Sequence, residues 1–106
     1  MIEQLKRYFS NKAKRKRHAL VAAAEGGQLK QVKKLLKSGI DPNSRCKDGF
    51  TALMRAAARG HVEVVAELLQ SGAEPLAQTR HGRTAVQIAV QEGRADVATL
   101  LQEKAS

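Results

Sequence analysis

Positively charged side chains are the residues of this sequence with the most evident binding chemistry. Residues 1–37 hold eleven basic and two acidic side chains, which accounts for the whole formal net charge of +9. The basic run at 12–17 and a stripe at helical spacing from 30 to 37 consist of Lys12, Lys14, Arg15, Lys16, Arg17, Lys30, Lys33, Lys34 and Lys37. This concentration predicts contact with a polyanion, either nucleic acid or an anionic membrane surface. The alternatives are a soluble covering for one end of the fold and, for the first run, a nuclear-import signal.

The histidines and the cysteine do not form a metal-binding pattern. His18, His61 and His81 are widely separated, and none stands at a metal-ligand spacing from another or from Cys46. We therefore predict no metal ion and no other cofactor. Cys46 stands between two cations, which favour the thiolate. Because the chain has no second cysteine to resolve an oxidised form, we interpret Cys46 as an incidental loop thiol rather than a redox sensor.

Catalytic motifs are also missing from the sequence. The chain has no glycine-rich phosphate loop after a strand and no Gly-x-Ser-x-Gly motif. Acids such as Glu63, Glu67 and Asp96 fit the solvated faces of helices, and no nucleophile is paired with a base. We predict a protein that binds another macromolecule and is not an enzyme.

The compartment follows from the cysteine count and the N-terminus. A single cysteine cannot form an internal disulfide, and the first residues lack the pattern of a secretory signal. The longest apolar run, Ala19–Ala24, is far shorter than the ~20 residues of a membrane-spanning helix. We expect a cytoplasmic protein, or a nuclear one if the organism is a eukaryote.

A repeat of 33 residues must position all of these groups. Gly27, Gly60 and Gly93 stand one period apart. The apolar positions that recur with them are Leu20, Leu53 and Val86, then Ala23, Ala56 and Ala89, then Leu35, Leu68 and Leu101. In the middle unit the pattern predicts one helix over 51–58 and a second over 62–70, with turns at Gly60 and Gly72. Neither helix is long enough to be stable alone, so the units must stack.

Caps and turn residues mark the ends of these elements. Thr51 and Thr84 are suitable N-caps, while Gly39 and Gly72 suit the left-handed position after the second helix of a unit. Segments 41–49 and 74–82 carry Pro, Asn and Gly at turn spacings and predict projecting hairpin-like loops. Over residues 1–12, a short amphipathic basic helix is expected, with Ile2, Leu5, Tyr8 and Phe9 on its apolar side.

The segment from Asp48 to Ala73 resembles an ankyrin repeat, with Thr51-Ala-Leu-Met in place of the signature Thr-Pro-Leu-His. The resemblance implies an all-α ankyrin-repeat solenoid of three helix-turn-helix units, 13–45, 46–78 and 79–106, with projecting hairpin loops and a basic N-terminal helix. Ala and Met or Gln replace the family's Pro and His in the signature. In the first unit, His18 stands where Thr51 and Thr84 stand in the others.

The resemblance also implies a concave groove that binds a protein. The family's groove positions fall here on Glu25, Arg45, Lys47, Asp48, Phe50, Ala58, Arg59, Gln78, Arg80, His81, Arg83, Gln91 and Glu92. Because basic groups dominate this set, we predict a monomeric adaptor or scaffold whose partner is an acidic or phosphorylated protein segment. The residues expected to contact it are Arg45, Lys47, Phe50, Arg59, Arg80, His81 and Arg83, with Phe50 as the apolar anchor.

Overall fold

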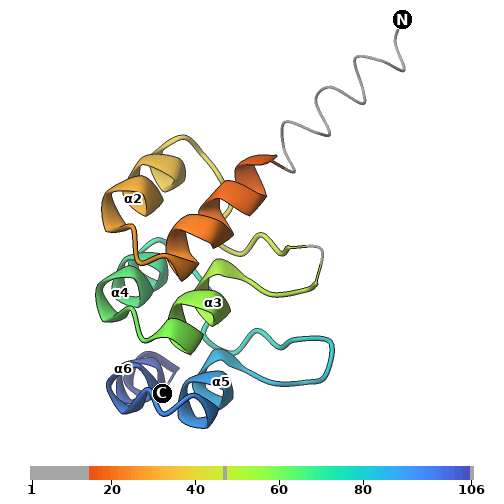
Figure 1. Ribbon diagram of the computed structural model, residues 1–106, viewed down its shortest axis with the longest axis vertical. Coiled ribbons are helices and arrows are strands. Elements are labelled where there is room, and N and C mark those ends of the chain that lie inside the picture. The colour runs from red at the N-terminus through yellow and green to blue at the C-terminus, as the bar shows by residue number, and fades with distance from the viewer. Residues whose placement is uncertain (1–14, 47, 106) are drawn as a thin grey trace, which may run out of the picture.

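The computed structural model describes residues 15–46 and 48–105, and within them it contains helices but no extended strands. Residues 15–25 are helical. The other helices are α2 (Leu29–Lys37), α3 (Ala52–Arg59), α4 (Val62–Gln70), α5 (Ala85–Gln91) and α6 (Ala95–Ala105). They form three successive helix-turn-helix pairs (Figure 1). The predicted all-α fold of three helix-turn-helix units is confirmed.

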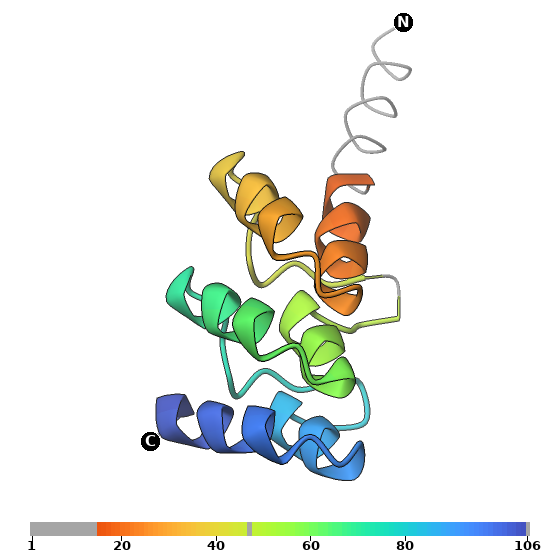
Figure 2. The same ribbon diagram turned by 60° about the vertical axis from the view of Figure 1, so that its left-hand side comes forward.

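The pairs stack in two layers. The helix at 15–25, α3 and α5 make one layer, while α2, α4 and α6 make the other (Figure 2). Contacts of α3 with α5 and of α2 with α4 and α4 with α6 join successive pairs. Side chains at the same position of each unit therefore lie one above the other, about one helix diameter apart.

The N-termini of α3 and α5 show how the altered signature still works. The hydroxyl of Thr51 accepts a hydrogen bond from the N–H of Met54, and the Met54 sulfur accepts one from the N–H of Thr51. Thr84 and Gln87 make the same reciprocal pair. Met54 and Gln87 thus supply a capping box at the position where the resemblance leads one to expect His.

The first unit differs from the other two at this position. His18 lies inside the helix at 15–25 and does not cap it. A histidine cannot replace a Thr hydroxyl as an N-cap, and the preceding Arg15, Lys16 and Arg17 are good helix formers. The helix therefore continues through His18 toward the N-terminus.

Glycines end the helices where a left-handed backbone is required. Gly60 follows α3 with a φ of 74°, and Gly39 and Gly72 have φ values of 96° and 100° after α2 and α4. These conformations confirm the predicted C′ glycines. As α3 runs from Ala52 to Arg59, the expected 51–58 helix is displaced by one residue, with Thr51 as the cap.

A continuous apolar core runs between the two layers. The largest fully buried side chains are Leu20, Leu53, Met54, Leu68, Leu101, Val32, Val64, Val65 and Val97. The inner helices also contribute small side chains to this core. Their buried alanines include Ala23, Ala24, Ala56, Ala57 and Ala89. Small side chains allow the inner helices to pack closely, which is why the chain needs few aromatic residues.

Two hairpin-like loops project from the stack, and each closes two residues after the end of the predicted segments 41–49 and 74–82. In the first finger, residues 45–51, the N–H of Cys46 bonds to the carbonyl of Phe50 over 2.9 Å. In the second finger, residues 78–84, the N–H of Thr79 bonds to the carbonyl of Arg83 over 2.8 Å. Single antiparallel bridges, Arg45 with Thr51 and Gln78 with Thr84, close the two fingers.

Some of the sequence predictions fall on residues that the structure does not describe. These are the amphipathic helix at 1–12, the cations Lys12 and Lys14, and Lys47 in the first finger. None of the helices within 15–46 and 48–105 combines the length and the apolar character that a membrane-spanning helix requires.

Candidate functional site

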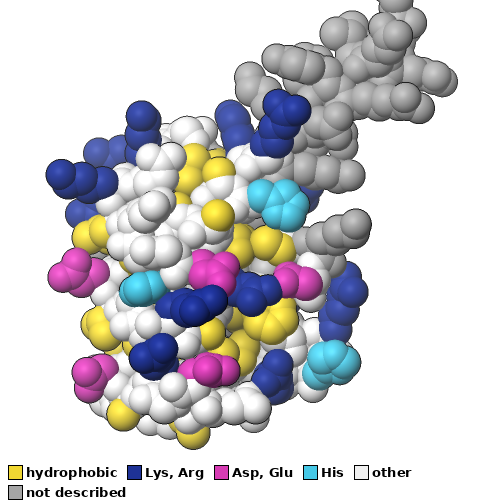
Figure 3. All heavy atoms as spheres, viewed as in Figure 1, with side chains coloured by type: hydrophobic (Ala, Val, Ile, Leu, Met, Phe, Trp, Pro, Cys, Tyr) yellow, Lys and Arg dark blue, Asp and Glu magenta, His cyan; other side chains and the backbone are white. Residues whose placement is uncertain are grey.

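The fingers and the inner helices form one continuous surface, which we call the inner face. It comprises residues 45–46, 48–51 and 78–84 of the fingers, the exposed sides of α3 and α5, and the C-terminal turns of the helix at 15–25, α3 and α5. Acidic and basic side chains gather in the middle of this surface (Figure 3). Most of the residues predicted to contact a partner lie on it.

Arg59, one of the predicted contact residues, forms an ion pair between two successive inner helices. Its Nη2 atom lies 3.0 Å from Oε1 of Glu25, and 61% of the Arg59 side chain remains exposed. An ion pair this exposed is worth only ~0–1 kcal/mol. A carboxylate or phosphate from another molecule can therefore displace Glu25 at little cost.

A cavity of about 310 Å³ opens beside this ion pair. Its walls come from the ends of three successive inner helices, and its lining residues are Glu25, Arg55, Ala58, Arg59, Glu92 and Arg94. Three guanidinium groups face two carboxylates there. The cavity suits an anionic side chain better than a cationic or apolar one.

Phe50, the predicted anchor, is partly covered by Arg55. The guanidinium carbon of Arg55 lies 4.3 Å from the centre of the Phe50 ring. Arg55 also forms an ion pair with Asp48, so the three side chains make one cluster at the base of the first finger. Phe50 is half-buried against the core and offers a partner less apolar surface than its sequence position suggests.

The carboxylate of Asp48 is stabilised by the same cluster. The N–H of Phe50 donates to Oδ1 of Asp48 over 3.1 Å, and this hydrogen bond is the main reason why the Asp48 pKa is lowered from 3.8. The charge of Arg55 lowers this pKa further, while partial desolvation opposes both effects. Asp48 is therefore anionic at neutral pH and holds the finger to α3.

Arg45 and Arg80 fasten the two fingers together. The Nη1 atom of Arg45 donates to the carbonyl oxygens of Gly49 and Gln78, each over 2.8 Å. The Arg80 side chain lies against Gly49, since a Cβ atom there would be 3.3 Å from its Cγ. Both arginines are exposed, and the hydrogen-bonding capacity of Arg45 is partly used in linking the two fingers.

His81 and Arg83 occupy the tip and base of the second finger. His81 is exposed, with its N–H held by the hydroxyl of Thr79 over 3.2 Å. Arg83 is half-buried and donates from Nη1 to Oε1 of Gln91 on α5. His81 thus presents its ring to solvent, while Arg83 is pre-oriented along the inner face.

The other two histidines contact residues that are distant in the sequence but close in the fold. His61 lies in the turn before α4, and its Nε2 atom is 2.8 Å from the carbonyl oxygen of Glu25. The Nδ1 atom of His18 lies 3.8 Å from the sulfur of Cys46 in the first finger. Throughout 15–46 and 48–105, no group of three or more His, Cys, Asp or Glu side chains could hold a metal ion.

Sequence reasoning missed two arginines of the inner face, Arg55 and Arg94. Arg55 stands one helical turn before Arg59, a spacing that places both side chains on the same side of α3. Arg94 stands 33 residues after His61, directly after the glycine turn of its unit. These two spacings were the signals available in the sequence.

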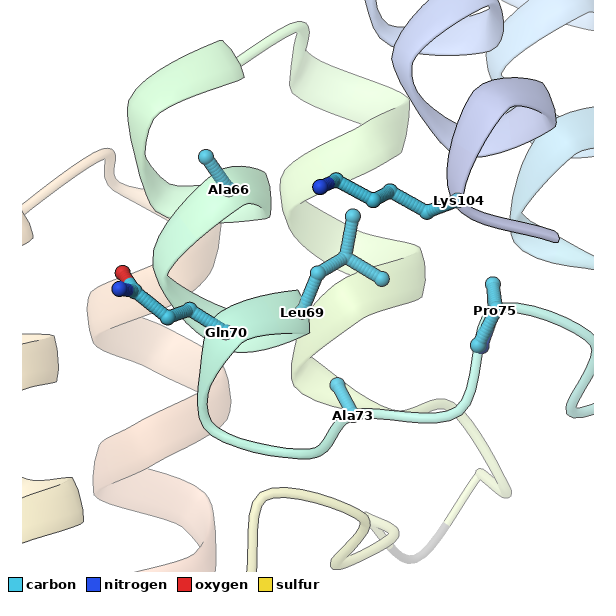
Figure 4. A pocket seen from close by; sticks show the side chains of 6 residues that line it. All are labelled: Ala66, Leu69, Gln70, Ala73, Pro75 and Lys104. Carbon is cyan, nitrogen blue, oxygen red and sulfur yellow. The ribbon is translucent and has the colours of Figure 1, made fainter.

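Another pocket, of about 340 Å³, lies away from the inner face. It is formed by α4, the loop after it and the end of α6, and its lining residues are Ala66, Leu69, Gln70, Ala73, Pro75 and Lys104. The Lys104 side chain extends from α6 toward Leu69 (Figure 4). Lys104 is the single ionisable group of this lining, so the pocket contains no acid–base pair.

Comparison with known families agrees with this geometry. A family model for ankyrin repeats matches residues 2–106 in three copies. The chain belongs to the ankyrin repeat family. No curated protein matches it closely enough to suggest a specific role.

Membership of the ankyrin repeat family defines the general activity. Ankyrin repeats are protein–protein interaction modules, and the family is typically non-enzymatic. The stacked units, the fingers and the inner face of this ankyrin protein are the surfaces available for such contacts.

Proposed function

We propose that this ankyrin protein is a cytoplasmic, monomeric adaptor whose inner face binds an acidic or phosphorylated segment of another protein. The observation that carries the proposal is the excess of guanidinium groups there. The described basic residues of the inner face are Arg45, Arg55, Arg59, Arg80, Arg83 and Arg94, and the acids are Glu25, Asp48 and Glu92. Arginine recognises carboxylate and phosphate groups through paired hydrogen bonds, which lysine cannot do as well.

The arrangement of these groups suggests how a segment would lie. The second finger carries Arg80 and His81, while Arg55, Arg59 and Arg94 line the 310 Å³ cavity at the ends of the inner helices. An extended chain with acidic groups several residues apart could contact both regions. The binding energy would come from exchanging weak internal ion pairs, such as Arg59 with Glu25, for bonds to the partner.

Two variants with equal charge test this assignment. The inner variant changes Arg59, Arg80 and Arg83 to Gln, and the outer variant changes Lys30, Lys33 and Lys37 on α2 to Gln. Binding of a fluorescent Glu-rich peptide and its phosphoserine counterpart is measured by anisotropy. We expect the inner variant to bind at least ~10-fold more weakly than the wild type, and the outer variant to bind within about 2-fold of it.

Two results would contradict the proposal. Equal weakening by both variants would mean that the peptide responds to net charge alone. Unchanged binding by the inner variant would show that the inner face is not the site. Thermal melts by circular dichroism establish that each variant is folded, and affinity purification from cells with the same pair of variants then identifies the natural partner.

A further inference from the structure

A second charged surface lies at the N-terminal end of the stack, outside the inner face. We call it the basic end, and its described members are Arg15, Lys16, Arg17, Lys30, Lys33, Lys34 and Lys37. All seven are exposed. In the view of Figure 3, Lys and Arg side chains project from both sides of this end of the molecule, and no acidic side chain is seen among them.

The fold brings two separate basic segments into one patch. A cavity of about 420 Å³ is lined by Lys16 and Arg17 from the first helix and by residues 38–41 and 44, which directly follow Lys37. The C-terminal end of α2 therefore lies beside the start of the described part of the first helix. This proximity depends on the antiparallel pairing of the two helices, and the sequence gives only two separate runs.

These cations are not neutralised within the part of the chain that the structure describes. Its ion pairs join Arg55 to Asp48 and Arg59 to Glu25, and neither involves the basic end. Nearby acids are few. Asp41 lines the cavity and accepts a hydrogen bond from the N–H of Asn43 over 2.8 Å, and Glu67 of α4 lies near Lys33 and Lys37.

The chemistry of the patch distinguishes between classes of polyanion. Among residues 15–46 and 48–105, the large hydrophobic side chains that are exposed are Val62, Leu76 and Val90, and none of these belongs to the basic end. A membrane-bound helix needs an apolar face to insert. A phosphate backbone does not, because the release of its counterions drives binding.

We propose that the basic end binds the phosphate backbone of duplex nucleic acid without sequence preference. The cations from Lys30 to Lys37 span ~10 Å along α2, and a duplex presents ~6 phosphate charges over that length. Lysines at helical spacing contact phosphates as point charges, and contacts to phosphates carry no sequence information.

The test measures salt dependence with the full chain. Binding of a fluorescent 20-base-pair duplex is followed by anisotropy between about 50 and 300 mM salt. If about seven cations contact phosphates, the slope of log affinity against log salt should be about −6. The outer variant, which lacks three of them, should have a slope of about −3 to −4 and bind on the order of 100-fold more weakly near 0.15 M salt.

The inner variant is the matched control, because it loses the same charge from the other face and should keep the wild-type slope. Two duplexes of unrelated sequence should bind within about 2-fold of each other.

Equal slopes for the outer and inner variants would overturn the proposal, as would a lack of duplex binding at 50 mM salt. Binding to phosphatidylserine vesicles but not to the duplex would also overturn it, in favour of a membrane surface. Peptide binding by the same variants reports on the inner face separately.

Discussion

The Nε atom of Arg94 donates a hydrogen bond to the carbonyl oxygen of Ala58 over 3.1 Å. One repeat earlier, Nε2 of His61 lies 2.8 Å from the carbonyl oxygen of Glu25. Both contacts join the turn of one unit to the end of the inner helix in the unit before it. Two chemically different side chains therefore make the same link between successive units. In each case a side-chain nitrogen reaches the carbonyl oxygen at the equivalent position of the preceding inner helix.

The first prediction concerns the glycine beneath His61. Gly27 has a φ of 68°, and a Cβ atom there would lie 2.7 Å from Nδ1 of His61, whereas Gly93 has a φ of 73° and nothing within 4 Å. Both Gly→Ala changes strain the backbone by ~1–2 kcal/mol. We expect Gly27→Ala to destabilise the fold by about 1–3 kcal/mol more than Gly93→Ala, as measured by urea unfolding.

A double-mutant cycle isolates the cause of that difference. In a His61→Ala background the space above residue 27 is open, so the extra cost of Gly27→Ala should shrink to within ~0.5 kcal/mol of the Gly93→Ala cost. An extra cost that persists without the imidazole would mean that the close contact with His61 is not responsible.

The second prediction tests the core between the layers. Leu68 of α4 is fully buried, while Leu76 in the second finger's approach loop is 62% exposed. Leu68→Ala should lower the free energy of unfolding by about 2–5 kcal/mol, and Leu76→Ala should change it by less than ~0.5 kcal/mol. A loss below ~1 kcal/mol for Leu68→Ala in a denaturant melt would contradict the packing of α4.

The helices and glycine turns that recur every 33 residues could be predicted from the sequence. The bounds of α4, Val62–Gln70, were predicted at both ends because glycine turns flank a strongly periodic segment. The side-chain contacts of the fingers were not predicted. Arg45 reaches the carbonyl of Gln78 in the next unit, 33 residues away, and Arg55 covers Phe50 within its own unit. Such contacts depend on the spacing of the stack and on side-chain rotamers, neither of which a local pattern determines.

The third prediction concerns the pH dependence of the first finger. Because the pKa of Asp48 is lowered from 3.8 in the folded chain, its carboxylate stabilises the fold above this unfolded value, and the contribution is lost as the pH falls through the folded pKa. Asp48→Asn should therefore be less stable than the wild type at pH 6–7, by under ~1 kcal/mol because the pair is solvent-exposed.

Melting curves from pH 7 to about pH 2 check the sign. The difference between Asp48→Asn and the wild type should shrink below about pH 4 and disappear once the wild-type carboxylate is protonated. Asp96→Asn, on the exposed first turn of α6, provides a comparison outside the finger. A difference for Asp48→Asn that stays constant across this range would rule out the carboxylate charge as its source.

The last prediction concerns Asn43, which joins the loops of the first two units. Its Nδ2 atom donates to the carbonyl of Gly72 over 3.0 Å, and its Oδ1 atom accepts from the N–H of Glu74 over 2.7 Å. Asn43→Ala removes both bonds and should cost about 1–3 kcal/mol. Ser44→Ala is the matched control, because its hydroxyl bonds only within its own loop, to the carbonyl of Asp41, and it should cost ~1 kcal/mol or less.

Amide hydrogen exchange at Glu74 separates the two bonds of Asn43. Asn43→Ala should speed exchange of this amide, because its acceptor is gone. Asn43→Asp keeps an acceptor for the Glu74 N–H but sets a carboxylate against the Gly72 carbonyl, so it should preserve the protection of Glu74 while still lowering the free energy of unfolding. Unchanged exchange at Glu74 in Asn43→Ala would show that this side chain does not couple the two units in solution. The coupling matters because a three-unit stack obtains most of its stability from contacts between neighbours.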